Sequence, residues 1–256
     1  MSGRAGPREL TIISIPLADE VLPGDSLAAK LLAAFRHQKL RLKQGDIVVI
    51  KHKIVSKAEG CLVDLSSVQP STSSMTWARK HKLDARVTEV ALSQSKRIVR
   101  RRSGVLITET SHGFVCANSG VDVSNVDGGR HALLLPEDPD RSARQLYRYI
   151  KKHLQLSIPV IITDTFGRPW REGLTEVAIG VAGMQALHDD RGRQDPHGYK
   201  LRVSIEAVAD ELACAAGLVC GKLARTPACI IRGFQYKPGA GTARDLIRPA
   251  ANDLFR

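Results

Sequence analysis

Short apolar runs rich in β-branched residues recur along this chain, separated by segments with helical spacing. The runs expected to form strands are Leu10–Ile15, Asp46–Lys51, Gly104–Glu109, Phe114–Ala117, Ile158–Ile162, Leu174–Val181 and Ala228–Arg232. Helical patterns follow Asp25 and cover 74–82, 84–98, Arg141–Leu154 and Ile205–Leu223. Because strands and helices do not alternate strictly as β-α-β units, their order predicts an α+β fold of mixed sheets and helices in two lobes. We expect residues 1–9 to be a flexible N-terminus and 10–256 to form a single domain; the pattern does not fix the boundary between the lobes.

An excess of basic side chains is the strongest compositional signal. The 256 residues include 38 Lys and Arg against 26 Asp and Glu, a formal net charge of +12. Such a charge favours anionic partners, which include nucleic acid, an anionic membrane and phosphorylated small molecules. The basic cluster at 96–102 makes a nucleic-acid-binding protein one alternative. No aromatic residues interleave with this cluster, however, and we expect no nucleic-acid partner.

Cysteine usage and hydropathy indicate the compartment. The five cysteines are odd in number and include no C-x-x-C pair. This argues against a disulfide framework or a structural zinc site and fits a reducing compartment. Residues 1–10 are polar, and no apolar run approaches the length of a membrane span. The sequence therefore predicts a cytoplasmic protein without a membrane partner.

An acidic residue stands just after the apolar run at 158–162. There Asp164 and Thr165 offer two hard oxygen ligands suited to Mg²⁺ or Mn²⁺. Asp164 could equally cap the following loop, and the residues alone leave both roles open. A metal-dependent phosphatase or kinase that uses Asp122 and Asp164 is a second alternative function. A Walker-type phosphate loop is not expected, because Gly217–Lys222 has the wrong glycine spacing.

The segment from 108 to 126 concentrates polar residues between short apolar stretches. It reads Thr-Glu-Thr-Ser-His-Gly-Phe-Val-Cys-Ala-Asn-Ser-Gly-Val-Asp-Val-Ser-Asn-Val. Asn, Ser and Gly allow sharp backbone turns, and Asp122 can bind a hard cation. A set of Asx and Ser turns linking two strands would have the same composition, so these residues alone do not decide between a turn and a site.

Within this segment, Thr-x-His-Gly-x-Val-x-Ala-Asn-x-Gly-Val-Asp-x-Ser-Asn-Val is similar to the signature of the coenzyme F-420-0:L-glutamate ligases. Four further blocks agree in order: Gly45-Asp46 through 55–60, 133–136 with 138–140, 161–168 with 171–173, and Glu206 with 208–211. Five ordered blocks are far more specific than any single motif. Gly221-Lys222-Leu223 looks more like bacterial than archaeal members, and we expect a bacterial-type chain that lacks the fused C-terminal domain of some members.

The resemblance implies a ligase domain over 10–256, in intertwined homodimers with the active site near the dimer interface. It implies that GTP phosphorylates the terminal carboxylate of the F-420-0 precursor and that the amine of L-glutamate attacks the acyl phosphate. Mg²⁺ or Mn²⁺, expected as two ions per site, would neutralise the triphosphate; K⁺ is a further candidate cation. The sequence does not settle GTP against ATP, Mg²⁺ against Mn²⁺, or the number of glutamates added.

The resemblance also implies roles for individual residues that stand at the family's functional positions. Asp122 and Asp164 match family metal ligands, and Thr165 matches a ligand of a second metal. Lys57 and Asn125 match nucleotide contacts, and the point charge of Lys57 suits a phosphate. Lys57 could instead be an ordinary solvated lysine.

Other candidates match the family less closely. His52 and Lys53 fall where the family touches GTP, although other members have smaller polar residues there. Arg168 and Arg171, in a loop bounded by glycines, could clamp a carboxylate or a phosphate. His112 could be catalytic or could make a structural hydrogen bond.

Two departures from the family pattern affect the nucleotide and metal sites. Residues 17–19 replace a Gly-Leu-Pro element that lines the nucleotide site in many members. Lys222 stands where some members place an acidic metal ligand. A protonated lysine cannot bind a cation, so either the second metal site is rebuilt or Lys222 binds phosphate.

Overall fold

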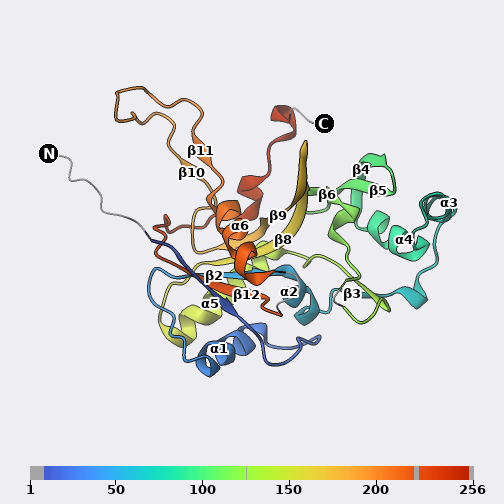
Figure 1. The fold of residues 1–256 in the computed structure, drawn as a ribbon, viewed down its shortest axis with the longest axis horizontal. Coiled ribbons are helices and arrows are strands. Elements are labelled where there is room, and N and C mark those ends of the chain that lie inside the picture. Colours follow the sequence, from blue (N-terminus) through green and yellow to red (C-terminus); the bar gives the residue numbers. More distant parts are fainter. Residues whose placement is uncertain (1–8, 125, 222–224, 254–256) are drawn as a thin grey trace.

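A five-stranded sheet forms the centre of the protein (Figure 1), whose computed structural model describes residues 9–124, 126–221 and 225–253. The strands lie in the order β1 (Thr11–Ile15), β12 (Ala228–Arg232), β2 (Ile47–Lys51), β8 (Val160–Arg168) and β9 (Arg171–Ala182). The central pair β2 and β8 is parallel, and the other neighbours in this sheet are antiparallel. The carboxyl end of β2, at Lys51, therefore lies beside Thr163 in the middle of β8.

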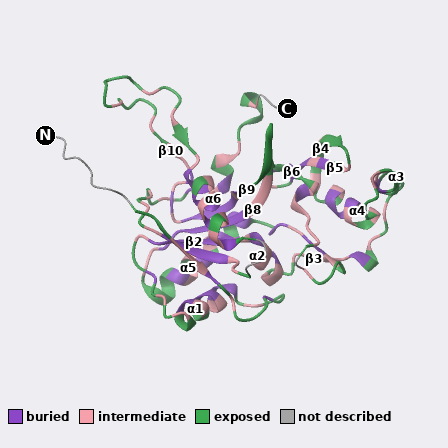
Figure 2. Cartoon of the chain, in the orientation of Figure 1, coloured by how far each residue is buried: buried purple, intermediate pink, exposed green. Residues whose placement is uncertain are grey.

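Helices cover both faces of this sheet. α1 (Leu27–His37) and α5 (Pro139–Leu154) lie on one side, and α6 (Val208–Cys220) lies on the other (Figure 1). The strands between them are apolar along most of their length, as expected for a sheet covered on both faces. Ile50, Ile162 and Ile230 are 0% exposed, and Figure 2 shows this buried layer between the helices.

The amphipathic pattern of 141–154 correctly predicts α5, and the preceding residues explain where the helix begins. The side chain of Asp138 caps the helix by accepting a hydrogen bond of 2.9 Å from the backbone N–H of Arg141. Pro139 occupies the first turn, where no backbone donor is needed. Three basic residues, 151–153, fill the last turn, where they face the negative end of the helix dipole.

A second group of elements lies to one side of the central sheet. β3 (Leu62–Asp64) pairs with β7 (His131–Leu133), and β4 (Ser95–Arg102), β5 (Val105–Thr110) and β6 (Val115–Ala117) form a three-stranded sheet in that order. α3 (Thr72–His81) and α4 (Ala85–Ser93) pack against each other beside it. Leu65, Val90 and Ala132 form a small separate hydrophobic cluster here.

The predicted helix over 84–98 is wrong in its second half. α4 ends at Ser93, and the basic cluster that follows forms strand β4. β4 pairs antiparallel with β5, from Ser95 opposite Thr110 to Arg102 opposite Val105. Hydrogen bonds to a neighbouring strand thus override a helical spacing that the residues could also satisfy.

The predicted helix over 205–223 begins late. Ile205–Glu206 forms β11, which pairs with β10 (His188–Asp189), and helix α6 starts at Val208. The predicted end of this helix falls on residues that the structure does not describe. Between β10 and β11 the chain extends from the body as an arm (Figure 1).

The remaining elements are short. α2 (His52–Ala58) follows β2 directly, and 3-10 turns lie at Leu65–Ser67, Asn118–Gly120, Ala243–Leu246 and Ala250–Asn252. Over the described ranges, no helix has the length and apolar character needed to cross a membrane. The structure confirms a mixed fold of several sheets and helices; the two lobes and the homodimer stay predictions.

Candidate active site

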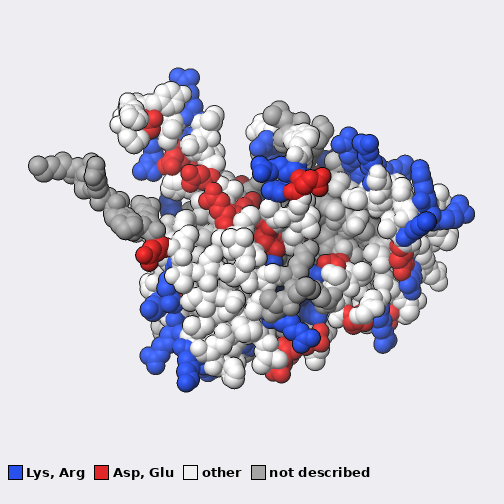
Figure 3. Space-filling model, viewed as in Figure 1, with Lys and Arg blue, Asp and Glu red and all other residues white. Residues whose placement is uncertain are grey.

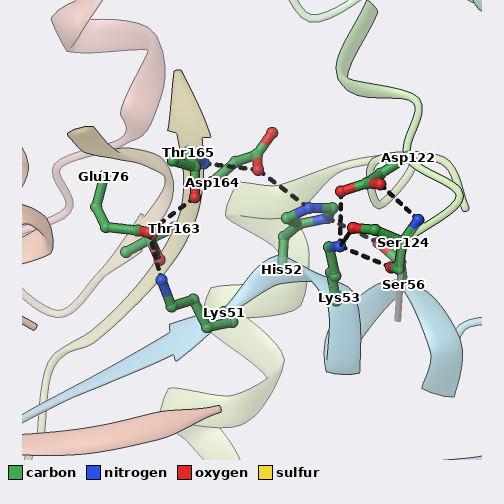
Figure 4. A network of polar contacts seen from close by, with 10 residues as sticks. All are labelled: Lys51, His52, Lys53, Ser56, Asp122, Ser124, Thr163, Asp164, Thr165 and Glu176. Carbon is green, nitrogen blue, oxygen red and sulfur yellow. Dashed lines mark hydrogen bonds and ion pairs between the residues drawn. The ribbon is translucent and has the colours of Figure 1, made fainter. Parts of the chain in front are cut away.

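Strand β2 passes into helix α2 without a loop, and this junction organises the polar residues of the site. Lys51 is the last residue of β2, and His52 is the first residue of α2. Because the backbone changes from extended to helical here, the side chains of Lys51, His52 and Lys53 point in three directions (Figure 4). Each one meets an acidic residue from a different part of the chain.

His52 meets Asp164. His52 directly follows β2, Asp164 lies in the parallel neighbour β8, and His52 Nε2 lies 3.1 Å from Asp164 Oδ1. His52 is 2% exposed. Its Nδ1 lies 3.3 Å from the hydroxyl of Ser56, one turn further along α2. In the tautomer with the proton on Nε2, His52 donates to Asp164 and its Nδ1 accepts from the Ser56 hydroxyl.

Lys53 meets Asp122. Its Nζ lies 2.6 Å from Asp122 Oδ2 and donates to the backbone oxygen of Ser124 at 2.9 Å. The Ser124 backbone N–H donates to Asp122 Oδ1 at 2.7 Å. Burial alone would raise the pKa of Asp122, but the hydrogen bonds from Lys53 and Ser124 outweigh it and lower the pKa. Asp122 is therefore an anion at neutral pH.

Lys51 meets Glu176, a carboxylate that the sequence analysis missed. Glu176 is 7% exposed and forms an ion pair with Lys51. It also accepts hydrogen bonds of 2.8 Å from the hydroxyls of Thr163 and Thr165. The signal that could have found this cluster is the Thr-x-Thr alternation at the end of an apolar run, which places two hydroxyls on one face of a strand.

Lys57 lies in the last turn of α2 and pairs with Glu20 at 2.7 Å. The Lys57 side chain is 12% exposed, whereas that of Glu20 is 63% exposed. A pair with one such exposed partner is worth about 0–1 kcal/mol. Lys57 can therefore exchange Glu20 for a stronger anion at little cost.

His112 belongs to a different environment. Its Nε2 lies 3.0 Å from the backbone oxygens of both Pro136 and Glu137, and its ring stacks on Phe114 at 5.6 Å. Phe114 in turn contacts Phe166 of β8 edge to face. These contacts are those of a structural histidine that holds the 108–126 segment against β8; a catalytic role stays a prediction.

Arg168 and Arg171 lie at the tip of the β8–β9 hairpin rather than in a loop, because they are the terminal cross-strand pair. Arg168 Nη2 donates to the backbone oxygen of Glu172 at 2.6 Å. Arg168 follows Asp164 by four residues, which corresponds to roughly 13 Å along an extended strand. The structure does not bring these arginines to Asp164 within one chain, and their catalytic role stays a prediction.

Two other predicted residues and one predicted surface feature remain. Asn125 and Lys222 fall on residues that the structure does not describe. The basic cluster at 96–102 lies on β4, the edge strand of the three-stranded sheet, and Figure 3 shows its blue side chains at that end of the molecule. A basic edge strand is one way in which proteins prevent unwanted strand pairing.

The donor set fits a divalent cation completed by substrate. Among the described residues, no three His, Cys, Asp or Glu side chains form a ready-made metal cage. His52 and the backbone N–H of Thr165 both contact Oδ1 of Asp164, so Oδ2 is the oxygen of this carboxylate that can face a cation. Mg²⁺ is commonly held by one or two carboxylates together with substrate phosphates and water. Asp122 and Asp164 are carboxylates of this kind, and Thr165, on the opposite face of β8 from Asp164, can offer a hydroxyl oxygen to a second position.

The nearby thiol of Cys116 is not available for chemistry. Burial, together with the negative charge of Asp164, raises the pKa of Cys116 to about 12. The thiol therefore keeps its proton at neutral pH and is a poor nucleophile.

The fold and the site together define a class: a mixed α/β protein whose carboxylates and lysines meet where β2 ends beside its parallel neighbour β8, an arrangement suited to anionic ligands. The family model described as F420-0:Gamma-glutamyl ligase matches residues 17–233. The chain belongs to this family, which confirms the resemblance of its sequence motifs.

Individual relatives agree with this assignment over nearly the whole chain. The coenzyme F420:L-glutamate ligase of Methanopyrus kandleri is 44% identical over 252 residues, covering 96% of this chain and 98% of the relative. The ligase of the same name from Methanothermobacter thermautotrophicus is 40% identical and covers 96% and 99%. That of Methanocaldococcus jannaschii is 43% identical and covers 84% and 86%. The predicted bacterial type is not tested by these matches.

Proposed function

We propose that this protein attaches L-glutamate to the F420-0 precursor and that GTP drives the reaction through an acyl phosphate. The observation that carries the proposal is the β2–α2 junction. It places His52 against Asp164 and Lys53 against Asp122 in a chain of this family. Two carboxylates for cations and adjacent lysines for phosphates are the groups that phosphoryl transfer requires.

The proposed chemistry has two steps. An oxygen of the precursor carboxylate attacks the γ-phosphorus of GTP, the bond from that phosphorus to the β–γ bridging oxygen breaks, and GDP leaves. The glutamate amine then attacks the acyl carbon, the carbon–oxygen bond to phosphate breaks, and the amine loses a proton as the amide forms. Both steps bring several anions together, which the +12 net charge of the chain favours.

The residues of the site have separate tasks in this scheme. Bound Mg²⁺ or Mn²⁺, held by Asp122, Asp164 and Thr165, would neutralise the triphosphate. Lys57 leaves Glu20 and contacts phosphate. Lys53 keeps Asp122 ionised before the nucleotide arrives and can then turn to the phosphates, because a lysine is a flexible point charge. His52 holds Asp164 in a fixed orientation through a buried hydrogen bond.

A single assay tests this function. Purified protein is incubated with F420-0, L-glutamate, GTP and Mn²⁺, and mass spectrometry follows increments of one glutamate. Parallel reactions replace GTP with ATP, replace Mn²⁺ with Mg²⁺ with or without K⁺, add a chelator, or omit glutamate. Glutamate increments that need GTP and disappear with the chelator support the proposal. Phosphate release without any increment would instead identify a phosphatase.

We also propose that the active protein is a homodimer. Large apolar side chains lie exposed on β9, on the arm and on α6: Leu174 is 57%, Val203 89% and Leu218 85% exposed. Burying such side chains against a second copy would remove them from water. Light scattering at micromolar concentration should give twice the chain mass, and a monomer mass would contradict a site shared between two copies.

A further inference from the structure

Glu176 lies directly across the β8–β9 hairpin from Thr165. The two residues are Cα partners in the antiparallel register, so their side chains are on the same face of the sheet. Helix α6 covers this face. A Cβ built on Gly217 would lie 2.7 Å from Glu176 Cγ, so the glycine leaves the room that the carboxylate stem occupies.

Three donors converge on the two oxygens of Glu176 (Figure 4). Thr163 donates to Oε2 and Thr165 donates to Oε1, each at 2.8 Å, and the ammonium group of Lys51 pairs with Oε1. A buried carboxylate is tolerated when it is paired and hydrogen-bonded in this way. The cluster therefore holds Glu176 in one orientation.

The bond from Thr165 fixes the direction of its hydroxyl. An ionised carboxylate can only accept, so the Thr165 hydroxyl must be the donor. Its proton points to Glu176, and the lone pairs of Oγ1 point elsewhere. Asp164, one residue earlier, faces the opposite side of the strand towards His52 (Figure 4). Thr165 thus presents an oxygen to a position different from that served by Asp164.

We propose that Glu176 is the positioning residue that turns the Thr165 oxygen towards the second cation of the site, with Lys51 balancing its charge. The proposal rests on the metal-dependent function proposed above and adds a residue and an ion pair to it. Removing a group that hydrogen-bonds a metal ligand typically lowers metal affinity by roughly 10–100-fold.

The test measures Mn²⁺ binding rather than turnover. Electron paramagnetic resonance of free Mn²⁺ gives the affinity of each ion in the presence of a non-hydrolysable GTP analogue. Glu176→Ala should weaken binding of the second Mn²⁺ by roughly 10–100-fold. Thr165→Val should weaken it equally, and the double variant should show no further loss, because both changes remove one coupled interaction.

Two variants separate positioning from general structure. In Glu176→Gln the carbonyl oxygen can replace Oε1 and still accept from Lys51 and Thr165, while the amide donates to Thr163; Mn²⁺ affinity should stay close to wild type. Thr163→Val removes a neighbouring bond to Glu176 but no proposed ligand, and it should also leave Mn²⁺ affinity close to wild type. Melting curves identify any variant that does not fold.

Clear outcomes would overturn the proposal. A folded Thr165→Val protein that binds both Mn²⁺ ions like wild type contradicts it, even if Glu176→Ala does not fold. Equal losses in Thr163→Val and Glu176→Ala would reduce Glu176 to a structural role. If the proposed function itself is wrong, the wild-type protein adds no glutamate. If the wild-type protein adds glutamate but Glu176→Ala and Thr165→Val bind Mn²⁺ normally, only this inference is overturned.

Discussion

Arg232→Met should strongly destabilise the protein without touching the site. Arg232, at the end of β12, forms a two-pronged pair with Asp46, which immediately precedes β2; Nε lies 2.7 Å from Oδ1 and Nη2 lies 2.8 Å from Oδ2. The Asp46 side chain is only 1% exposed. The pair fastens β12 to β2, the strand that leads into the site.

The structure sets the size of the effect. Removing one partner of a fully buried ion pair costs about 3–5 kcal/mol, because the remaining charge is left without its counter-ion. Here Asp46 is buried but the Arg232 side chain is 29% exposed, and solvent reduces the cost. Asp46 keeps a hydrogen bond of 2.8 Å from the backbone N–H of Lys43, and methionine preserves much of the packing of the arginine stem. We therefore expect the lower end, about 3 kcal/mol, which lowers Tm by roughly 6–12 °C in a chain of this size.

Chemical denaturation of wild type and variant measures the difference in the free energy of unfolding. Arg86→Met is the matched control, since Arg86 makes a similar bidentate contact with Asp84 but both side chains are exposed. That control should leave the free energy of unfolding close to wild type, because a solvent-exposed pair contributes little. Asp46→Asn should recover part of the loss in the Arg232→Met background by removing the unpaired charge. Equal costs for Arg232→Met and Arg86→Met would refute the reasoning.

Three further predictions concern the site. Asp164→Asn should abolish ligation with an unchanged melting curve, because an amide cannot neutralise a cation; near-normal turnover would exclude Asp164 as a metal ligand. Lys57→Ala should raise the KM for GTP, whereas Glu20→Ala, which only frees Lys57, should not; equal nucleotide affinity in wild type and Lys57→Ala would leave this residue an ordinary surface lysine. Lys222→Ala should raise the KM for GTP or for the precursor more than it lowers kcat, and steady-state kinetics with each substrate varied in turn checks this.

The strands of the central sheet were predictable because short runs of β-branched residues favour a strand over a helix. The apolar runs in β2, β8 and β12 are short and β-branched, although β8 continues through polar residues to Arg168, six residues past the predicted end at Ile162. The basic segment of β4 was not predictable in the same way. Its spacing suits a helix, and only its pairing with β5 makes it a strand. Pairing is a tertiary interaction that the spacing of one segment does not encode.

The site also contains residues that the sequence predicts and one that only the tertiary structure shows. Asp122 and Asp164 stand out in motifs, and the structure brings both to the same junction through His52 and Lys53. Glu176 does not stand out, because it occupies an ordinary position in a strand and its partner Lys51 is 125 residues away in the sequence. Register across a hairpin and between parallel strands creates that contact, and neither register can be read from the residues alone.

The loop-free junction between β2 and α2 also limits how this site can be altered. Three successive residues, Lys51 to Lys53, each contact a different acidic side chain. Deleting or inserting a single residue there would turn the following side chains by about 100° around the helix axis and would break the His52 and Lys53 contacts at once. Libraries that vary loop length, the usual route to new specificity in parallel-sheet enzymes, would therefore fail at this position, and diversification must keep the length constant and change residue identity alone.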